Sequence, residues 1–360
     1  MKTKVFIEIL PRLSTCYVFI KMEKKVKHLS LKPNEIRLIY DSDDTSEEVI
    51  AVDCITLKPD TISSLEFYDQ TINFRVFIDR IAIYEPPEQA LDISSELDFK
   101  PEFSEDTSTS IKCRCCNYDI VKDVKFKRIL PLPSGILDRS DFFCHDHPDS
   151  SVRTASLSPS DEDCFYGQSY VLIKYKNNQN SLILHCEKCL AWLGTFQNDS
   201  VLKLWNCSTI LSNVNITPQS ISYDSFCQLI RKICVTSFYG SVKVVLESQV
   251  EKNETNYLLL WILDDKLVCL TDDAQSEEET SERSRICLIQ KRTVKVLYLF
   301  QEVKTPLAQN WMKSINITTI DVAKQMFLSA LSHLNCVNQK LPAASRKTNN
   351  MFLSYLDPIL

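Results

Sequence analysis

Two short cysteine motifs hold the residues of this chain best suited to chemistry. The first motif reads Cys113-Arg-Cys115-Cys116 and the second reads Cys186-Glu-Lys-Cys189. The C-x-x-C spacing turns two thiolates toward one point, and four thiolates complete the closed tetrahedral site of a structural zinc ion. The sequence therefore predicts one structural zinc ion, bound by Cys113, Cys116, Cys186 and Cys189, with Cys115 as a bystander.

Two other interpretations of these cysteines stay open at this point. They could be two unrelated buried pairs in a reduced cytosolic protein, and His185 could replace one of the sulfur ligands. About 70 residues separate the two motifs, which is longer than in a zinc ribbon. This spacing predicts a folded β domain that the ion holds at two hairpin tips.

A thiol and two imidazoles share one short stretch, Cys144-His145-Asp146-His147. A neighbouring imidazole lowers the pKa of a thiol and raises its thiolate fraction. Three interpretations stay open: a turn held by hydrogen bonds, a second metal site through Cys144 and His147, or a reactive or partner-docking thiol.

The composition excludes several classes of enzyme. The 360 residues include only four glycines, whereas average usage of about 7% gives roughly 25. The chain accordingly lacks the glycine-rich dinucleotide loop, the phosphate-binding loop and the nucleophile elbow. A net charge of −6 argues against direct binding of nucleic acid, which favours a basic surface.

The amino-terminal residues indicate a cytoplasmic protein, with the nucleus as a second compartment. They contain no apolar segment of signal-peptide length. No stretch approaches the 18 apolar residues of a membrane span, so no membrane partner is expected. The 15 cysteines are therefore expected to be reduced.

The hydrophobic pattern predicts a mostly β chain with some helix, in the α+β class. Alternating β-branched and aromatic residues predict strands at 4–10, 16–22, 35–41, 49–57 and 73–84. They form an antiparallel β domain over 1–105. A zinc-clamped β domain with a long loop is expected over 106–206, and an α+β region over 207–360. In that last region we expect helices at 222–237 and 319–334, and strands at 242–246, 257–263, 267–270, 286–290 and 294–300.

The remaining cysteines lie mostly in apolar patterns, and we expect a group of them to be core residues. This group is Cys16, Cys54, Cys164, Cys207, Cys227, Cys234, Cys269 and Cys287.

The second cysteine motif continues as CEKCLAWLG. This pattern resembles the second knuckle of β-tent zinc domains, as in Yippee-type proteins and the drug-binding domain of cereblon. A wider series of motifs occurs in order along the chain: C-x-x-C, VKFKRILPLPS, FFCHDHPD, EDCFYGQSYVLI, CEKCLAWLG and TVKVLYLF. This series resembles the HECT-like E2-binding protein family of ubiquitin-protein ligases, over roughly residues 110–360.

The resemblance implies a β-rich fold, an E2 ubiquitin-conjugating enzyme as partner, and ubiquitin and a protein substrate or client as further partners. It implies E2 contacts in residues 131–163 and in a second region near 216–241. The implied E2-binding residues are Pro131, Pro133, Cys144, His145, His147, Pro148, Phe226 and Ile230. Cys144 is then the reactive or E2-docking thiol.

The chain departs from a HECT ligase in one respect. The stretch that should carry a Thr-Cys acceptor reads Thr318-Thr319-Ile320-Asp321, and Cys336 is the only thiol in the last 70 residues. We therefore predict no HECT-type thioester in the C-terminal region. Two functions stay open: an E3 ligase that promotes acyl transfer with an E2, or a non-catalytic, zinc-stabilised scaffold for a client such as an mRNA 3′-end processing factor. Fungal members of the family have a link to that machinery.

Overall fold

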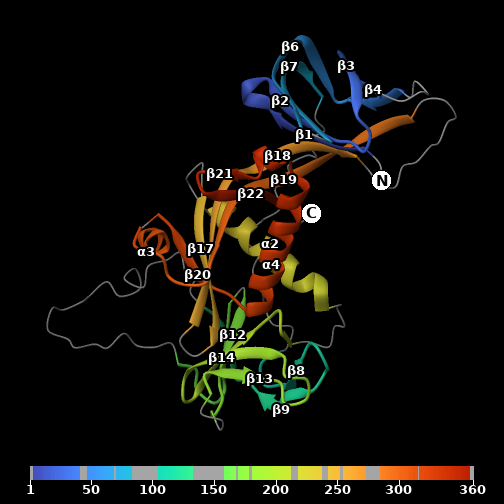
Figure 1. Ribbon diagram of the computed structural model, residues 1–360. Helices are drawn as coiled ribbons and strands as arrows, with labels where there is room; N and C mark the ends of the chain where they lie inside the picture. The colour runs from blue at the N-terminus through green and yellow to red at the C-terminus, as the bar shows by residue number, and fades with distance from the viewer. Residues whose placement is uncertain are drawn as a thin grey trace.

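The computed structural model of the chain confirms a mostly β fold with a few helices (Figure 1). It describes residues 3–40, 47–68, 70–82, 104–132, 158–167, 169–177, 181–211, 218–236, 242–251, 254–272, 284–314 and 316–356. Within these residues, no helix combines the length and the apolar character that a bilayer span requires.

The N-terminal strands form most of a barrel. They are β1 (Lys4–Leu10), β2 (Thr15–Lys21), β3 (Val26–Lys32), β4 (Glu35–Tyr40), β5 (Glu47–Ala51), β6 (Ile55–Tyr68) and β7 (Thr71–Ile81), with a 3-10 turn at Pro11–Leu13. The sheet order is β3-β4-β5-β19-β18-β1-β2-β7-β6. The edge strand β6 returns to the β3–β4 turn, where the Leu57 N–H donates to the Pro33 carbonyl at 2.7 Å. Every second side chain points inward, so Ile7, Val18 and Phe74 fill the interior.

Two long strands connect this barrel to the rest of the molecule. They are β18 (Glu254–Asp272) and β19 (Ser284–Gln301), drawn in orange in Figure 1. Near the barrel β18 pairs with β1, and further along it pairs with β17 (Val242–Glu251). The first and last thirds of the sequence therefore share one 13-stranded sheet. The domain boundaries expected at 105 and 206 stay predictions.

The lower part of this sheet carries helices on both faces (Figure 1). The strands β20 (Thr318–Asp321), β21 (Lys347–Thr348) and β22 (Met351–Leu356) complete the sheet, and a 3-10 turn spans Ala343–Ser345. The helices α2 (Pro218–Thr236) and α4 (Lys324–Lys340) pack on Val244 and Leu246, whereas α3 (Pro306–Met312) lies on the side of Val245. Because side chains alternate along β17, this strand contributes residues to the apolar core on each face of the sheet.

The middle of the chain forms two smaller sheets that face each other. One has the order β10 (Arg128–Pro131), β11 (Asp163–Tyr166), β12 (Tyr170–Lys174), β15 (Val201–Trp205), β14 (Trp192–Asn198) and β13 (Ile183–His185). The other consists of β16 (Thr209–Ile210), β8 (Ser108–Cys113) and β9 (Asp119–Lys125). Ile111 and Phe126 pack against Val171, Leu202 and Leu204 to form their common core. We call this unit the cysteine block.

Several boundaries differ from the expected ones. The strand expected at 49–57 is two strands, because a turn at 52–54 interrupts it. The strands expected at 257–263 and 267–270 form the single strand β18, because the polar residues between them are absorbed as bulges rather than a turn. The strands expected at 286–290 and 294–300 likewise form β19. The helix expected at 319–334 begins only at Lys324, because Thr318–Asp321 pairs in parallel with β17. The expected elements also lacked β3, α3, β14, β15 and the C-terminal strands β20, β21 and β22.

The core assignment of the cysteines is largely confirmed. Five are buried, namely Cys16, Cys164, Cys207, Cys227 and Cys269, and Cys54 and Cys234 are partly buried. Cys287 is exposed, so its assignment was wrong. Its neighbours Ile286 and Leu288 pack against the barrel core, and the alternation of β19 turns Cys287 outward.

We predict that Gly194 cannot be replaced without loss of stability. A Cβ at Gly194 would lie 2.1 Å from the Lys203 carbonyl oxygen of the paired strand β15. Gly194→Ala should lower the free energy of unfolding by about 1–3 kcal/mol, the usual cost of overpacking. In the control Gly167→Ala, the new Cβ would meet the Leu132 side chain at 3.4 Å and the Tyr170 carbonyl oxygen at 3.5 Å, which are ordinary van der Waals distances. Equal denaturation midpoints for the two variants would contradict the prediction.

Candidate metal centre and partner-binding segment

The two cysteine motifs form turns with the same backbone hydrogen bonds. In the first turn, the Cys113 N–H donates to the Tyr118 carbonyl at 2.8 Å, and the Asn117 N–H donates to the Cys113 carbonyl at 2.8 Å. Asn117 adopts a left-handed conformation with φ of 57°. This residue type tolerates that conformation better than most.

The second turn repeats this pattern five and four residues after its first cysteine. The Cys186 N–H donates to the Ala191 carbonyl at 2.8 Å, the Leu190 N–H donates to the Cys186 carbonyl at 2.9 Å, and Leu190 has φ of 60°. Leucine tolerates the left-handed backbone conformation less well than asparagine does, and Leu190 nevertheless adopts it. The local geometry is therefore imposed by the turn and not by residue propensity.

The four sulfur atoms converge between the two turns. The Sγ atoms of Cys113 and Cys189 are 3.7 Å apart, and those of Cys116 and Cys186 are 3.5 Å apart. All four lie within 4.8 Å of one another. A tetrahedral ion with metal–sulfur bonds of about 2.3 Å separates its ligands by roughly 3.8 Å. The four cysteines could thus hold one metal ion in a closed site.

The backbone favours the thiolate form of one of these ligands. Burial alone would raise the pKa of Cys186, but hydrogen bonds from the backbone N–H groups of Cys189 and Lys188 and from the Cys116 and Cys189 thiols together outweigh it and lower the pKa to about 7. In Cys113 burial dominates and raises the pKa. A thiolate is the form that ligates metals.

The two residues next to the ligands lie outside the sulfur cluster. Cys115 is exposed, as expected for a bystander. His185 is exposed on β13, and its ring lies against Trp192 with the centroids 6.1 Å apart. In the described part of the chain, the cluster consists of four cysteines and no histidine.

The cysteine block contacts the start of helix α4 through side chains. The Gln325 Nε2 group donates to the Trp192 carbonyl at 2.8 Å, three residues after the ligand Cys189. The Ser208 hydroxyl donates to the Gln325 Oε1 atom at 3.4 Å. These bonds connect the second cysteine turn to the helical layer.

A buried lysine makes the second connection. The Lys203 ammonium lies 2.7 Å from the Asp321 carboxylate, and 4.0 and 4.3 Å from the ring centroids of Tyr170 and Trp205. Burial lowers the pKa of Lys203, and the Asp321 carboxylate acts in the opposite direction. Lys203 thus ties β15 to β20.

The segment expected to bind an E2 begins and ends on paired strands. Pro131 ends β10 and is exposed, and β10 pairs in parallel with β11, with Arg128 opposite Asp163. The residues Pro133, Cys144, His145, His147 and Pro148 lie outside the described residues. What the structure gives is therefore the two ends of the segment.

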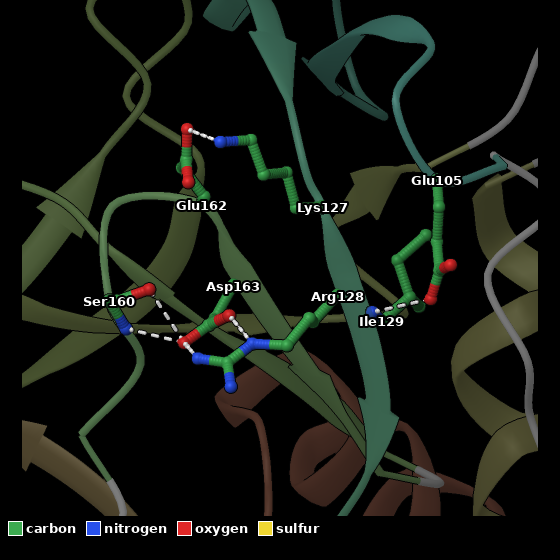
Figure 2. A network of polar contacts seen from close by, with 7 residues as sticks. All are labelled: Glu105, Lys127, Arg128, Ile129, Ser160, Glu162 and Asp163. Carbon is green, nitrogen blue, oxygen red and sulfur yellow. Dashed lines mark hydrogen bonds and ion pairs between the residues drawn. The ribbon is translucent and has the colours of Figure 1, made fainter.

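A polar clamp holds these ends together (Figure 2). The Arg128 Nε and Nη2 atoms donate to the two carboxylate oxygens of Asp163 at 2.6 and 2.7 Å. The Ser160 N–H and hydroxyl also donate to that carboxylate, at 3.0 and 2.6 Å. A second ion pair joins Lys127 to Glu162 at 2.8 Å. The bidentate geometry fixes the register of β10 on β11.

The two α2 residues expected to contact an E2 are core residues. Phe226 and Ile230 are 0% and 1% exposed and pack between α2 and the large sheet. Their helical spacing predicted a buried face correctly, but burial removes their side chains from any partner surface. Asp224, Gln228 and Val235 are exposed on α2.

Sequence reasoning missed the clamp and both connections between the cysteine block and the C-terminal region. Arg128 and Asp163 lie 35 residues apart, and Lys203 and Asp321 lie 118 apart. No local pattern links such pairs. A lysine within the apolar run VLKLW was the one available signal, because a buried lysine requires a partner.

The fold and the sulfur cluster define a β-rich protein whose described residues include a four-cysteine cluster that could hold a metal ion. The family model described as HECT-like ubiquitin-conjugating enzyme (E2)-binding matches residues 8–353. The chain belongs to this family.

Curated relatives agree with this assignment. The chain is similar to a mouse protein named as an E3 ubiquitin-protein ligase, with 22% identity over 99% of this chain and 98% of the relative. The rat protein of the same name is 22% identical over 98% and 96%, and the human one is 23% identical over 68% and 71%. No solved structure matches the chain significantly.

We predict that the clamp stabilises the protein only above acidic pH. Hydrogen bonds from Arg128 and Ser160 lower the pKa of Asp163. The resulting stability is present above the unfolded pKa of about 4 and is lost as the pH falls through the lower folded value. Asp163→Asn should therefore melt below the wild type at about pH 7, and the difference should narrow below about pH 4.

The matched control is Asp161→Asn, which removes the same charge from an exposed pair with Lys174 at 3.2 Å. Thermal unfolding of this variant should follow the wild type at every pH. The role given to ionised Asp163 would be contradicted if the melting temperature of Asp163→Asn stayed below that of the wild type by the same amount between about pH 7 and 3.

Proposed function

We propose that this chain is an E3 ubiquitin-protein ligase that binds an E2 and promotes ubiquitin transfer to a substrate or to itself. The observation that carries the proposal is the family match over residues 8–353, nearly the whole chain. The name shared by the relatives supports the same function.

The proposed metal is a single structural zinc ion at Cys113, Cys116, Cys186 and Cys189. Four sulfur ligands at tetrahedral separations suit zinc, and a closed site without an open position suits a structural role. The ion crosslinks the two sheets of the cysteine block, because each sheet contributes one turn.

The proposed E2 surface consists of residues 131–163 together with the exposed side of α2. The clamp between Arg128 and Asp163 supports this assignment, because it fixes both ends of the segment on the same edge of a sheet. Cys144 is kept as the reactive or docking thiol of this segment. Gln228 and Val235 replace Phe226 and Ile230 as the proposed contacts on α2.

In this proposal the ubiquitin thioester stays on the E2. The candidate acceptor Cys336 lies exposed on α4, and the nearest imidazole in sequence, His333, has a structural role. The His333 Nε2 atom lies 2.9 Å from the Tyr223 hydroxyl, and the two rings stack with centroids 4.2 Å apart. An imidazole held in this way is poorly placed to activate a thiol.

The alternative is a scaffold that grips a client or an E2 without promoting transfer. Two observations fit this scaffold as well as they fit the ligase. His333 is held by Tyr223, and β20 contains no cysteine. The two functions differ in one outcome, the discharge of a charged E2.

We predict that Cys186→Ser removes the metal and unfolds the cysteine block, because a structural site contributes folding free energy directly. The bound zinc should fall from one ion per chain to well below one, as measured by elemental analysis. The control Cys115→Ser changes an exposed cysteine of the same motif and should keep one zinc. Stoichiometric zinc in folded Cys186→Ser protein would show that the ligand set is wrong.

We predict that the wild type accelerates single-turnover discharge of a charged E2 without a ubiquitin adduct on its own cysteines. Cys336→Ser should discharge the E2 at the wild-type rate. Cys144→Ala should discharge it at least about tenfold more slowly, since it removes the thiol that, with the thioester kept on the E2, acts in docking.

Two outcomes would change this assignment. A DTT-sensitive ubiquitin adduct that disappears only in Cys336→Ser would restore a HECT-like mechanism. E2 binding without any accelerated discharge would favour the scaffold.

A further inference from the structure

A polar cleft lies where the outer face of the barrel meets the C-terminal strands. Its volume is about 350 Å³, and its polar lining includes Glu8, Tyr17, Asn73, Arg75, Lys295 and Tyr355, together with the exposed Glu66, which pairs with Asn73 across β6 and β7. The strand register explains this grouping. Glu8 pairs with Tyr17 and Tyr17 with Arg75, while Asn73 lies one row further along β7. Their neighbours along each strand face the barrel interior, so these side chains face outward.

At one end of the cleft, the charged groups neutralise each other. The Lys295 ammonium lies 2.5 Å from one oxygen of Glu8, which is only 2% exposed. The Tyr355 hydroxyl donates to the other oxygen at 3.3 Å. This end therefore holds a neutral, internally satisfied pair.

The other end carries polar groups that lack partners. Asn73 is 7% exposed, and neither its Nδ2 nor its Oδ1 atom has a hydrogen-bond partner among the described residues. The same is true of the Arg75 Nε atom. Buried polar atoms are nearly always hydrogen-bonded, so unpartnered atoms on two adjacent cleft residues indicate a missing partner.

The Arg75 guanidinium is positioned by aromatic rings. Its central carbon lies 5.8 Å from the Tyr17 ring centroid and 5.6 Å from that of Phe77. Among the described residues it pairs with no carboxylate. It is thus a cation that is oriented but not neutralised, next to an amide that needs both a donor and an acceptor.

We propose that this cleft binds a carboxylate adjacent to an amide, as found at the C-terminus of a peptide or in an N-acyl amino acid. The carboxylate pairs with the planar fork of Arg75. The carbonyl of the adjacent amide accepts from Asn73 Nδ2, and the N–H of the next amide along a peptide donates to Asn73 Oδ1, because the C=O and N–H of one trans amide point in opposite directions. The unpartnered atoms of Asn73 and Arg75 are closed to solvent in the free protein, so binding includes a rotation of the half-buried Arg75 side chain.

This inference is independent of the proposed ligase function. The cleft is formed by the barrel and by β19 and β22, not by the cysteine block or the segment at 131–163. Loss of binding at this cleft would leave E2 discharge unchanged, and failure of the ligase proposal would leave the cleft intact.

Ligand-observed NMR titration of the full chain tests the proposal with three probes. They are N-acetylglycine, acetyl-Ala-Ala-Gly with a free carboxylate, and the same tripeptide with a C-terminal amide. Both acids should bind, and capping the carboxylate should weaken binding at least about tenfold, because the charge-assisted bond to Arg75 is lost. A tripeptide acid that binds more tightly than N-acetylglycine identifies a peptide terminus as the source, and equal affinity identifies a small acid.

Three variants test whether binding occurs in the cleft or elsewhere on the protein surface. Arg75→Ala and Asn73→Leu should each weaken binding of the tripeptide acid at least about tenfold, with thermal unfolding as the check on folding. Arg80→Ala removes the same charge from an exposed position on β7 outside the cleft and should bind as the wild type does. The proposal is overturned if the wild type binds neither acid, if the amide binds as tightly as the acid, or if Arg80→Ala loses as much affinity as Arg75→Ala.

Discussion

The convergence of four cysteine sulfurs is the constraint on which the middle of this protein depends. The two turns that supply them belong to different sheets and are about 70 residues apart in sequence. The core between these sheets is small, and several of its residues are the cysteines themselves. A crosslink at this point restricts the unfolded chain and aligns the two sheets. The proposed zinc ion therefore stabilises this block, whereas a larger apolar core stabilises the barrel.

The position of the cysteine block bears on function through its contacts with the C-terminal region. Gln325 reaches the Trp192 carbonyl just beyond the second metal-binding turn, and Lys203 reaches Asp321 on β20. Helix α4 in turn packs on α2. The proposed E2 surface includes the outer side of α2 and the segment that leaves the cysteine block at β10. One contiguous set of elements thus links the metal site to both halves of that surface.

The sequence predicted the features that depend on local pattern. Spacing alone identified the four cysteines whose sulfur atoms converge, and alternation identified most strands of the barrel. It failed where tertiary pairing decides the outcome. Thr318–Asp321 has no local signal that separates a helix start from a strand, and its parallel pairing with β17 makes it β20. Phe226 and Ile230 could not be divided between core and partner surface, because an apolar helical face looks the same in both roles. The bidentate pair of Arg128 and Asp163 depends on a parallel contact between distant strands, which no periodicity encodes.

X-ray absorption at the zinc edge tests the central claim most directly, because it reports the ligand atoms around the ion in the intact protein. The four-cysteine site predicts a first shell of four sulfurs at about 2.3 Å and no nitrogen or oxygen ligand. A first shell with nitrogen or oxygen, or fewer than four sulfurs, would contradict it. So would purified folded protein that contains no zinc.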